Sequence, residues 1–291
     1  MSSKMSEKSS GALNNTEDAV PPGPPTYEEV DSTVPAYYDQ VILPPSTSRK
    51  PLLFPSEFTL SYRVGRSISF LYETKDQPLY AIRTPRVATG WTEIVLLNGT
   101  DKLSAPLASA SVEKGSKTTR TNLRLMPRPN GSYQEPIDIS MSGNYSMRHQ
   151  FTIPTDPGGE QESFEWRSSK GRLIKDLVGG FQFGAKLVRL GGPTIAPAGN
   201  GSSDDGDDGE MDGITSDGKS IVAIYAGERW HYSQCKFRFI NEGARGQLGE
   251  VFELAAVMSF VRLFEVQIAA GISASYMSAS SASSAAAAAS A

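Results

Sequence analysis

Apolar and polar residues alternate along much of the chain after residue 57. The first alternating run reads FTLSYRV over residues 58–64, and a second run, ISFLY, follows over residues 68–72. A period of two is typical of a β-strand with one buried face. Because only Gly65, Arg66 and Ser67 separate the two runs, the pattern predicts a hairpin.

Ten further short runs follow at spacings of roughly ten residues, with Gly, Pro, Asn or Asp between them. No helical pattern separates them, so the chain is expected to form a sandwich or barrel of about a dozen strands. The ten runs cover residues 79–83, 93–97, 107–112, 122–126, 137–141, 145–153, 164–167, 185–190, 221–225 and 236–240.

Residues 250–270 form the longest apolar stretch and contain no glycine or proline. Apolar residues would cover every face of a helix here, as in a membrane span or a helix at the centre of a core. Arg262 and Glu265 would each cost about 2.5–3.5 kcal/mol near mid-bilayer, and their i, i+3 spacing allows them to pair. We therefore expect a core helix over residues 247–270, with a span over residues 254–270 as the alternative.

The other regions lack these patterns. Residues 1–55 are rich in Ser, Pro, Glu and Lys and are expected to be a disordered tail. Residues 191–220 include the run DDGDDGE and predict a solvated, disordered acidic loop. Residues 272–291 form a Ser/Ala low-complexity tail. One β-rich domain over residues 56–271 remains.

Composition narrows the class of protein. The 291 residues carry a formal net charge of -4 and a single cysteine, Cys235. A disulfide-built secreted scaffold is therefore excluded, and the first fifty residues contain no signal-peptide core. We expect a cytoplasmic protein, with the nucleus as a second location. The acidic balance also argues against a nucleic-acid partner.

About twelve strands followed by one apolar C-terminal helix is an unusual order of elements. Two stretches carry a closer likeness: FEWR at 164–167 followed by GAKLVRL at 184–190, and KFRF at 236–239 continuing through GQLGE at 246–250. Over residues 58–270 the chain resembles the tubby C-terminal-like superfamily, which includes tubby-like proteins, phospholipid scramblases and LURP-one-related proteins. The likeness is greatest to its fungal members.

The resemblance implies a closed β-barrel around a buried hydrophobic helix. For tubby-like members it also implies a phosphoinositide-binding patch built from a Lys and an Arg two residues apart. This chain has two such pairs, Lys170 with Arg172 and Lys236 with Arg238. Scramblase activity is not expected, because the chain has neither a cysteine cluster for palmitoylation nor a calcium loop.

Two segments are locally basic, residues 114–128 and residues 163–190. If neighbouring strands bring such residues together, they form an anion site for lipid headgroups, each charge contributing on the order of 1 kcal/mol at an anionic surface. The alternative is that these residues only keep the outer wall soluble. The candidate headgroup-binding residues are Lys170, Arg172, Lys175, Lys186, Arg189, Lys236 and Arg238.

The N-terminal tail contains a complete PPxY motif formed by Pro24, Pro25 and Tyr27. Proline pre-orders an extended segment that loses little entropy on docking to an aromatic groove. The motif predicts a WW-domain partner, a class that includes ubiquitin ligases. A chance match in a proline-rich tail is the alternative. Tyr37 and Tyr38 lack the double proline and do not form a second copy.

Catalytic and metal-binding patterns are weak. His231 and Cys235 are four residues apart, which places them on one face only in a helix, and this segment predicts strand or turn. An EF-hand reading that begins at Asp208 has Lys219 at position twelve, where a bidentate Glu is required. We therefore expect no enzyme activity, no cofactor and no metal.

The sequence thus favours a non-enzymatic adaptor, in which the barrel binds anionic phospholipid headgroups and the PPxY tail recruits a WW-domain protein. The alternative is a protein-interaction or structural barrel with no lipid role.

Overall fold

The computed structural model describes residues 52–62, 66–84, 93–112, 120–143, 148–154, 160–179, 182–192, 194, 213–228 and 234–288. Side chains are described as far as residue 268. All of these residues belong to one compact unit, Ser48–Ala291.

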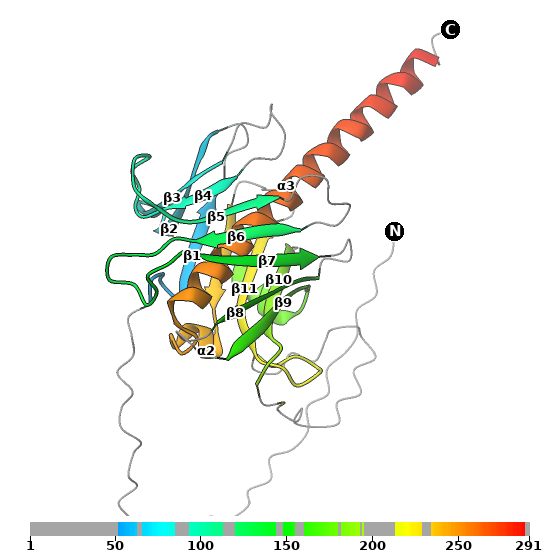
Figure 1. Ribbon diagram of the computed structural model, residues 1–291. Coiled ribbons are helices and arrows are strands. Elements are labelled where there is room, and N and C mark those ends of the chain that lie inside the picture. The colour runs from blue at the N-terminus through cyan, green and yellow to red at the C-terminus, as the bar shows by residue number, and fades with distance from the viewer. Residues whose placement is uncertain are drawn as a thin grey trace, which may run out of the picture. The chain divides into compact units, whose positions relative to one another are not determined.

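Twelve antiparallel strands close into a single barrel (Figure 1). Each strand pairs with its neighbours in the sequence, and β1 closes the ring by pairing with β12. The expectation of a closed barrel of about twelve strands is therefore confirmed. The strands are β1 Glu57–Ser61, β2 Ile68–Thr74, β3 Gln77–Arg83, β4 Ile94–Leu97, β5 Pro106–Val112, β6 Thr121–Leu125, β7 Ile137–Gly143, β8 His149–Pro154, β9 Gln161–Ser168, β10 Gln182–Arg189, β11 Ile221–Glu228 and β12 Gln234–Phe239.

The C-terminal helix α3, Gly249–Ala288, passes through the barrel (Figure 1). Every residue from Val251 to Phe264 is buried, as expected for a helix that contacts strands on all sides. Phe260 packs against Phe58, Tyr225 and Phe237 from three different strands. The inward side chains of the alternating strands and the all-round apolar helix thus form one core.

One polar interaction joins the helix to the wall, and a second lies within the helix itself. The indole N–H of Trp166 on β9 donates to the hydroxyl of Ser259, 2.9 Å away. Arg262 donates to Glu265 one turn later, so the predicted i, i+3 pair is present. Among the described residues, no helix combines the length and the apolar character needed to cross a bilayer.

The direction of α3 distinguishes the two ends of the barrel. Phe252, near its start, contacts Phe164 and Phe239, whereas Phe264 contacts Tyr62 and Phe183. We call the end where α3 begins the proximal end and the end where it leaves the distal end. Because all the strands are antiparallel, connections after odd-numbered strands lie at the distal end and those after even-numbered strands lie at the proximal end.

Two glutamates of α3 hold the proximal end together. Glu253 accepts hydrogen bonds from the backbone N–H of Leu53 at 2.6 Å and of Phe54 at 3.3 Å. Glu250 accepts from Arg128 at 3.2 Å and from the N–H of Ser132 at 3.0 Å. Burial raises the pKa of Glu253 from 4.5 to about 7, although the two N–H donors oppose this shift.

Two short helices complete the unit, α1 Arg172–Val178 between β9 and β10 and α2 Asn241–Ala244 between β12 and α3. Neither was predicted from the sequence. Helix α1 packs on the outside of the wall, where Ile174 and Leu177 form a second apolar cluster with Ile221, Ile224 and Ala226. This cluster fixes α1 against β10 and β11.

The structure corrects two boundaries. Helix α3 continues to Ala288, past the expected end at residue 270, because the Ala-rich sequence has the highest intrinsic helix propensity. The expected disordered loop over residues 191–220 is ordered at residues 213–220, where Ile214 bridges Ser220. This turn is ordered because neighbouring elements form hydrogen bonds with its polar side chains. Its composition alone did not indicate these contacts.

Candidate functional site

The candidate site is built around α1. The helix approaches the wall closely because residue 184 of β10 is glycine: a Cβ there would lie 2.4 Å from the backbone oxygen of Tyr225 and 2.7 Å from Ile174 Cγ2. Gly179 ends the helix in the left-handed conformation with φ of 65°. A small residue beneath the helix and a glycine cap therefore set the position of α1.

Three of the seven predicted headgroup-binding residues lie on α1 or just before it. Lys170, Arg172 and Lys175 are exposed, while Ile174 and Leu177 of the same segment point to the wall. Arg172 lies 3.5 Å from Asp176, and both side chains are exposed, 82% and 60%. A pair this open to solvent contributes little, so Arg172 can exchange Asp176 for another anion at little cost.

The two candidates on β10 are less accessible. Lys186 faces the outside of the wall opposite Arg167 of β9, but only 5% of it is exposed. Arg189 makes two hydrogen bonds with Glu162 of β9, one of them 2.9 Å long between Nε and Oε2. Both side chains of this pair are largely buried. The charge of Arg189 is therefore balanced within the wall.

The two candidates on β12 lie one strand beyond β11. Arg238 donates to Glu57 of β1 at 2.8 Å, and the two residues are directly opposite in the strand register. Lys236 is half-buried and has no ion pair among the described residues. Lys236 is directly opposite Ala226 of β11 in the strand register, and Ala226 belongs to the apolar cluster beneath α1.

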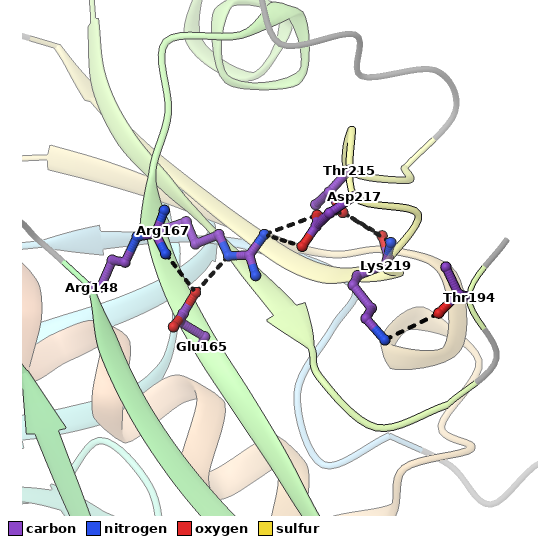
Figure 2. A network of polar contacts seen from close by, with 7 residues as sticks. All are labelled: Arg148, Glu165, Arg167, Thr194, Thr215, Asp217 and Lys219. Carbon is purple, nitrogen blue, oxygen red and sulfur yellow. Dashed lines mark hydrogen bonds and ion pairs between the residues drawn. The ribbon is translucent and has the colours of Figure 1, made fainter. Parts of the chain in front are cut away.

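Arg167 of β9 is the other basic residue of this region, and it belongs to a polar network. Figure 2 shows Arg167 between Glu165 and Asp217, with Arg148 reaching the same glutamate. Arg167 donates to Glu165 at 2.6 Å and to both carboxylate oxygens of Asp217 at 3.0 Å. Lys219 in turn donates to Thr194 at 3.3 Å. The network fastens the turn over residues 213–220 to β9.

The charges of this network are stabilised by one another. Burial alone would lower the pKa of Arg167, but hydrogen bonds to Glu165 and Asp217 outweigh it and raise the pKa. For Asp217, burial raises the pKa, but the Thr215 hydroxyl and Arg167 outweigh it and lower the pKa. Arg167 is thus a structural residue rather than a free anion receptor.

A separate hollow of about 310 Å³ lies on the outer face of β2. It is remote from α1 along the wall, because β1, β12 and β11 lie between β2 and β10. Its lining residues are Ser61, Arg66, Ser67, Ile68, Phe70, Tyr72 and Lys102.

The described residues show no cluster of three or more His, Cys, Asp or Glu side chains that would hold a metal ion. Cys235 is buried, and burial raises the pKa of its thiol well above the usual value, so the reactive thiolate is disfavoured. His231, the other member of the sequence-suggested pair, lies outside the described residues, as do Asp208 and the PPxY residues Pro24, Pro25 and Tyr27.

Sequence reasoning did not single out Arg66 and Arg148 as site residues. Both are exposed and lie at the distal end, in the β1–β2 and β7–β8 connections. The signal that could have found them is the alternation of strand direction, which assigns each connection to one end of an antiparallel barrel.

Comparisons with protein-family models, with curated proteins and with solved structures gave no match. The likeness to the tubby C-terminal-like superfamily therefore stays a prediction.

Proposed function

We propose that this protein is a non-enzymatic adaptor whose barrel binds anionic phospholipid headgroups and whose PPxY tail recruits a WW-domain partner. The headgroup site consists of Lys170, Arg172 and Lys175, with Lys236 beside it. The predicted relation to tubby-like proteins is in keeping with this proposal but does not carry it.

One observation carries the lipid part of the proposal. Three basic residues on α1 or just before it are exposed on the outside of the wall, while the apolar residues of α1 pack on β10 and β11. The cations are therefore held on a helix that is packed against the wall, and the acidic partner of Arg172 is the solvent-exposed Asp176. Phosphate groups at an anionic surface would gain on the order of 1 kcal/mol from each such cation.

The structure also argues against three of the seven candidate headgroup-binding residues. Lys186 is almost fully buried, and Arg189 and Arg238 are paired with Glu162 and Glu57. Breaking the largely buried Arg189–Glu162 pair would leave a carboxylate without its partner, which costs free energy. Arg238 is bonded to Glu57 across the β1–β12 pairing that closes the barrel. These three residues are therefore assigned to the stability of the wall.

The lipid part is tested by sedimentation with vesicles of phosphatidylcholine, with and without a phosphoinositide. The triple variant Lys170→Gln, Arg172→Gln, Lys175→Gln is expected to bind on the order of a hundred-fold more weakly than the wild type. The matched control is Lys75→Gln, Arg124→Gln, Arg245→Gln, which removes three exposed charges that lie outside α1 and is expected to bind as the wild type does. If the wild-type protein does not bind phosphoinositide vesicles at low salt, the lipid part of the proposal is wrong. The protein-interaction barrel then remains as the function.

The tail is tested separately by capture on immobilised WW domains. Tyr27→Ala is expected to abolish capture because it removes the second anchor of the motif. Tyr37→Ala is the control, since the double proline is missing before it, and should leave capture unchanged. Equal capture of wild type and Tyr27→Ala would remove the adaptor role and leave the lipid part standing.

A further inference from the structure

The hollow on the outer face of β2 has an aromatic floor. Ile68, Phe70 and Tyr72 of β2 line it. They alternate along the strand with the buried residues Ser69 and Leu71 and therefore point away from the core. The ring centroids of Phe70 and Tyr72 are 6.0 Å apart, and the two planes meet at 62°. An edge-to-face pair of this kind offers aromatic surface to a further flat apolar group.

Strands β3 and β4 support this floor from the side. Ile68 and Phe70 pack against an apolar cluster on the outside of the wall, which consists of Ala81, Val95 and Leu97. These three side chains are at most 6% exposed. Packing within the wall therefore sets the position of the floor residues, and the hollow is part of the fold.

Two cations from separate connections line the same hollow, Arg66 from the β1–β2 connection and Lys102 from the β4–β5 connection. Both are exposed, and neither forms an ion pair among the described residues. No acidic residue is among the described residues that line the hollow. The carboxylate of Asp101, next to Lys102, accepts a hydrogen bond from the N–H of Leu103 at 2.9 Å. The hollow is therefore locally positive in a chain with a formal net charge of -4.

Hydrogen bonds fix the backbone on both sides of the hollow. The hydroxyl of Thr84 donates to the carbonyl oxygen of Arg66 at 3.2 Å, and the N–H of Thr84 donates to the carbonyl oxygen of Ser67 at 3.0 Å. In the β4–β5 connection, Gly99 has a φ of 128°, and its carbonyl oxygen accepts the N–H of Ala81 at 2.8 Å. Both charged side chains thus extend from ordered connections, which lowers the entropic cost of binding a ligand.

From this arrangement we infer that the hollow binds an aryl phosphate, that is, a planar ring that carries a phosphate group. Its volume of about 310 Å³ lies at the small end of ligand pockets, which enclose about 300–1,000 Å³. A phosphate monoester carries a charge of about −1.5 to −2 at pH 7, which two cations balance, whereas a carboxylate would balance only one. The guanidinium of Arg66 can donate two parallel hydrogen bonds to a phosphate, while the ring lies against Phe70 and Tyr72.

This site is separate from the proposed headgroup site on α1. Helix α1 packs on β10 and β11, and β1, β12 and β11 lie between β2 and β10 in the wall. Failure of the lipid part of the proposed function would therefore leave this inference standing. The ligand chemistry has two sources, a free aryl phosphate and the side chain of a phosphotyrosine in a peptide.

The test is isothermal titration calorimetry of the full chain with naphthyl phosphate. The wild type is expected to bind it at least about tenfold more tightly than inorganic phosphate or naphthol, because each of these offers only one of the two groups. The variant Arg66→Gln, Lys102→Gln should bind on the order of a hundred-fold more weakly. The matched control is Arg172→Gln, Lys175→Gln, which removes one Arg and one Lys from α1 and should bind as the wild type does. All four side chains are exposed, so both variants are expected to fold.

If the wild type does not bind naphthyl phosphate, or binds naphthol or inorganic phosphate as tightly, the hollow is not a site for aryl phosphates. Equal binding by the two variants would place the ligand elsewhere and would also overturn the assignment. Titration with free phosphotyrosine and with a short peptide that contains it then separates the two sources. Tighter binding of the peptide would identify a phosphorylated protein as the ligand, and equal binding would identify a small molecule.

Discussion

The two ends of the barrel use their charged residues differently. At the proximal end, Glu250 and Glu253 of α3 accept hydrogen bonds from Arg128, Ser132, Leu53 and Phe54. These contacts join residues as many as 200 positions apart. In the connections after odd-numbered strands, the charges are mainly basic, and Arg148 and Arg172 keep 63% and 82% of their side chains exposed within their ion pairs.

This difference separates stability from recognition. Charges that are buried and hydrogen-bonded cannot be given up without a cost in unfolding free energy, so the proximal end is expected to be intolerant of substitution. Exposed charges contribute little to folding, so the distal end can carry a binding function at little cost. Substitutions at the two ends should therefore differ in their effect on stability.

The largest effect is expected from the aromatic side chains that α3 inserts into the core. Phe252→Ala, which loses contacts with Phe164 and Phe239, should lower the free energy of unfolding by about 3–5 kcal/mol in urea titrations. Phe264→Ala should cost less, because its neighbour Phe183 is only partly buried. Leu103→Ala is the control at a 92% exposed leucine. If Phe252→Ala and Phe264→Ala lowered the free energy of unfolding equally, the core would not be more stable at the proximal end.

Glu253 should make stability depend on pH. Because the pKa of Glu253 is raised from 4.5 to about 7, the folded protein binds a proton between these values that the unfolded chain has released. Stability should therefore fall as pH rises through this window, by about 3 kcal/mol in total. In Glu253→Gln, whose side chain cannot ionise, this loss should disappear. Chemical denaturation at pH 4.5, 6 and 8 measures the free energy of unfolding of both proteins. If that free energy fell with pH as steeply in the variant as in the wild type, Glu253 would not be the group responsible.

Ion pairs at the two ends should differ by a smaller amount. Arg128→Gln removes the partly buried bond to Glu250 and should cost about 1 kcal/mol. Arg172→Gln removes the exposed pair with Asp176 and should change the free energy of unfolding by less than about 0.5 kcal/mol. Thermal denaturation of both variants and of the wild type measures these costs. A larger loss of stability in Arg172→Gln than in Arg128→Gln would contradict the prediction.

The smallest effect is expected at His149, near the distal end. Burial, and then the charge of Arg262, lower the pKa of His149 below 6.5. The unfolded chain therefore takes up the proton first as pH falls below 6.5, and stability declines. His149→Gln should reduce this decline without changing stability at pH 8. Titration of the imidazole by NMR checks the direction, and a pKa above 6.5 would contradict it.

Much of the fold was predictable from local patterns. The alternation beginning at Phe58 gave the strands, and the all-round apolar run after Glu250 gave the enclosed helix. Helix α1 was missed because its amphipathic pattern, Leu173 and Ile174 followed by Leu177 and Val178, covers barely two turns. Short patterns of this kind do not separate a helix from a loop.

The site was harder to predict because it depends on strand pairing. Lys186, Arg189 and Lys175 look equivalent in the sequence, yet burial and the Glu162 contact separate the first two from the third. Those contacts follow from the register of β9 and β10, which composition does not reveal. The charge difference between the ends likewise becomes visible only when each connection is assigned to an end.

The most direct test of the division between the two ends is hydrogen exchange of the full chain, with and without vesicles that contain phosphatidylserine. Backbone amides of residues 169–179, which include α1, are predicted to gain protection on the vesicles, while those of residues 126–136 at the proximal end are not. Amides of residues 252–264 are predicted to exchange slowly in both conditions. Protection gained at residues 126–136, or at both ends alike, would contradict these predictions.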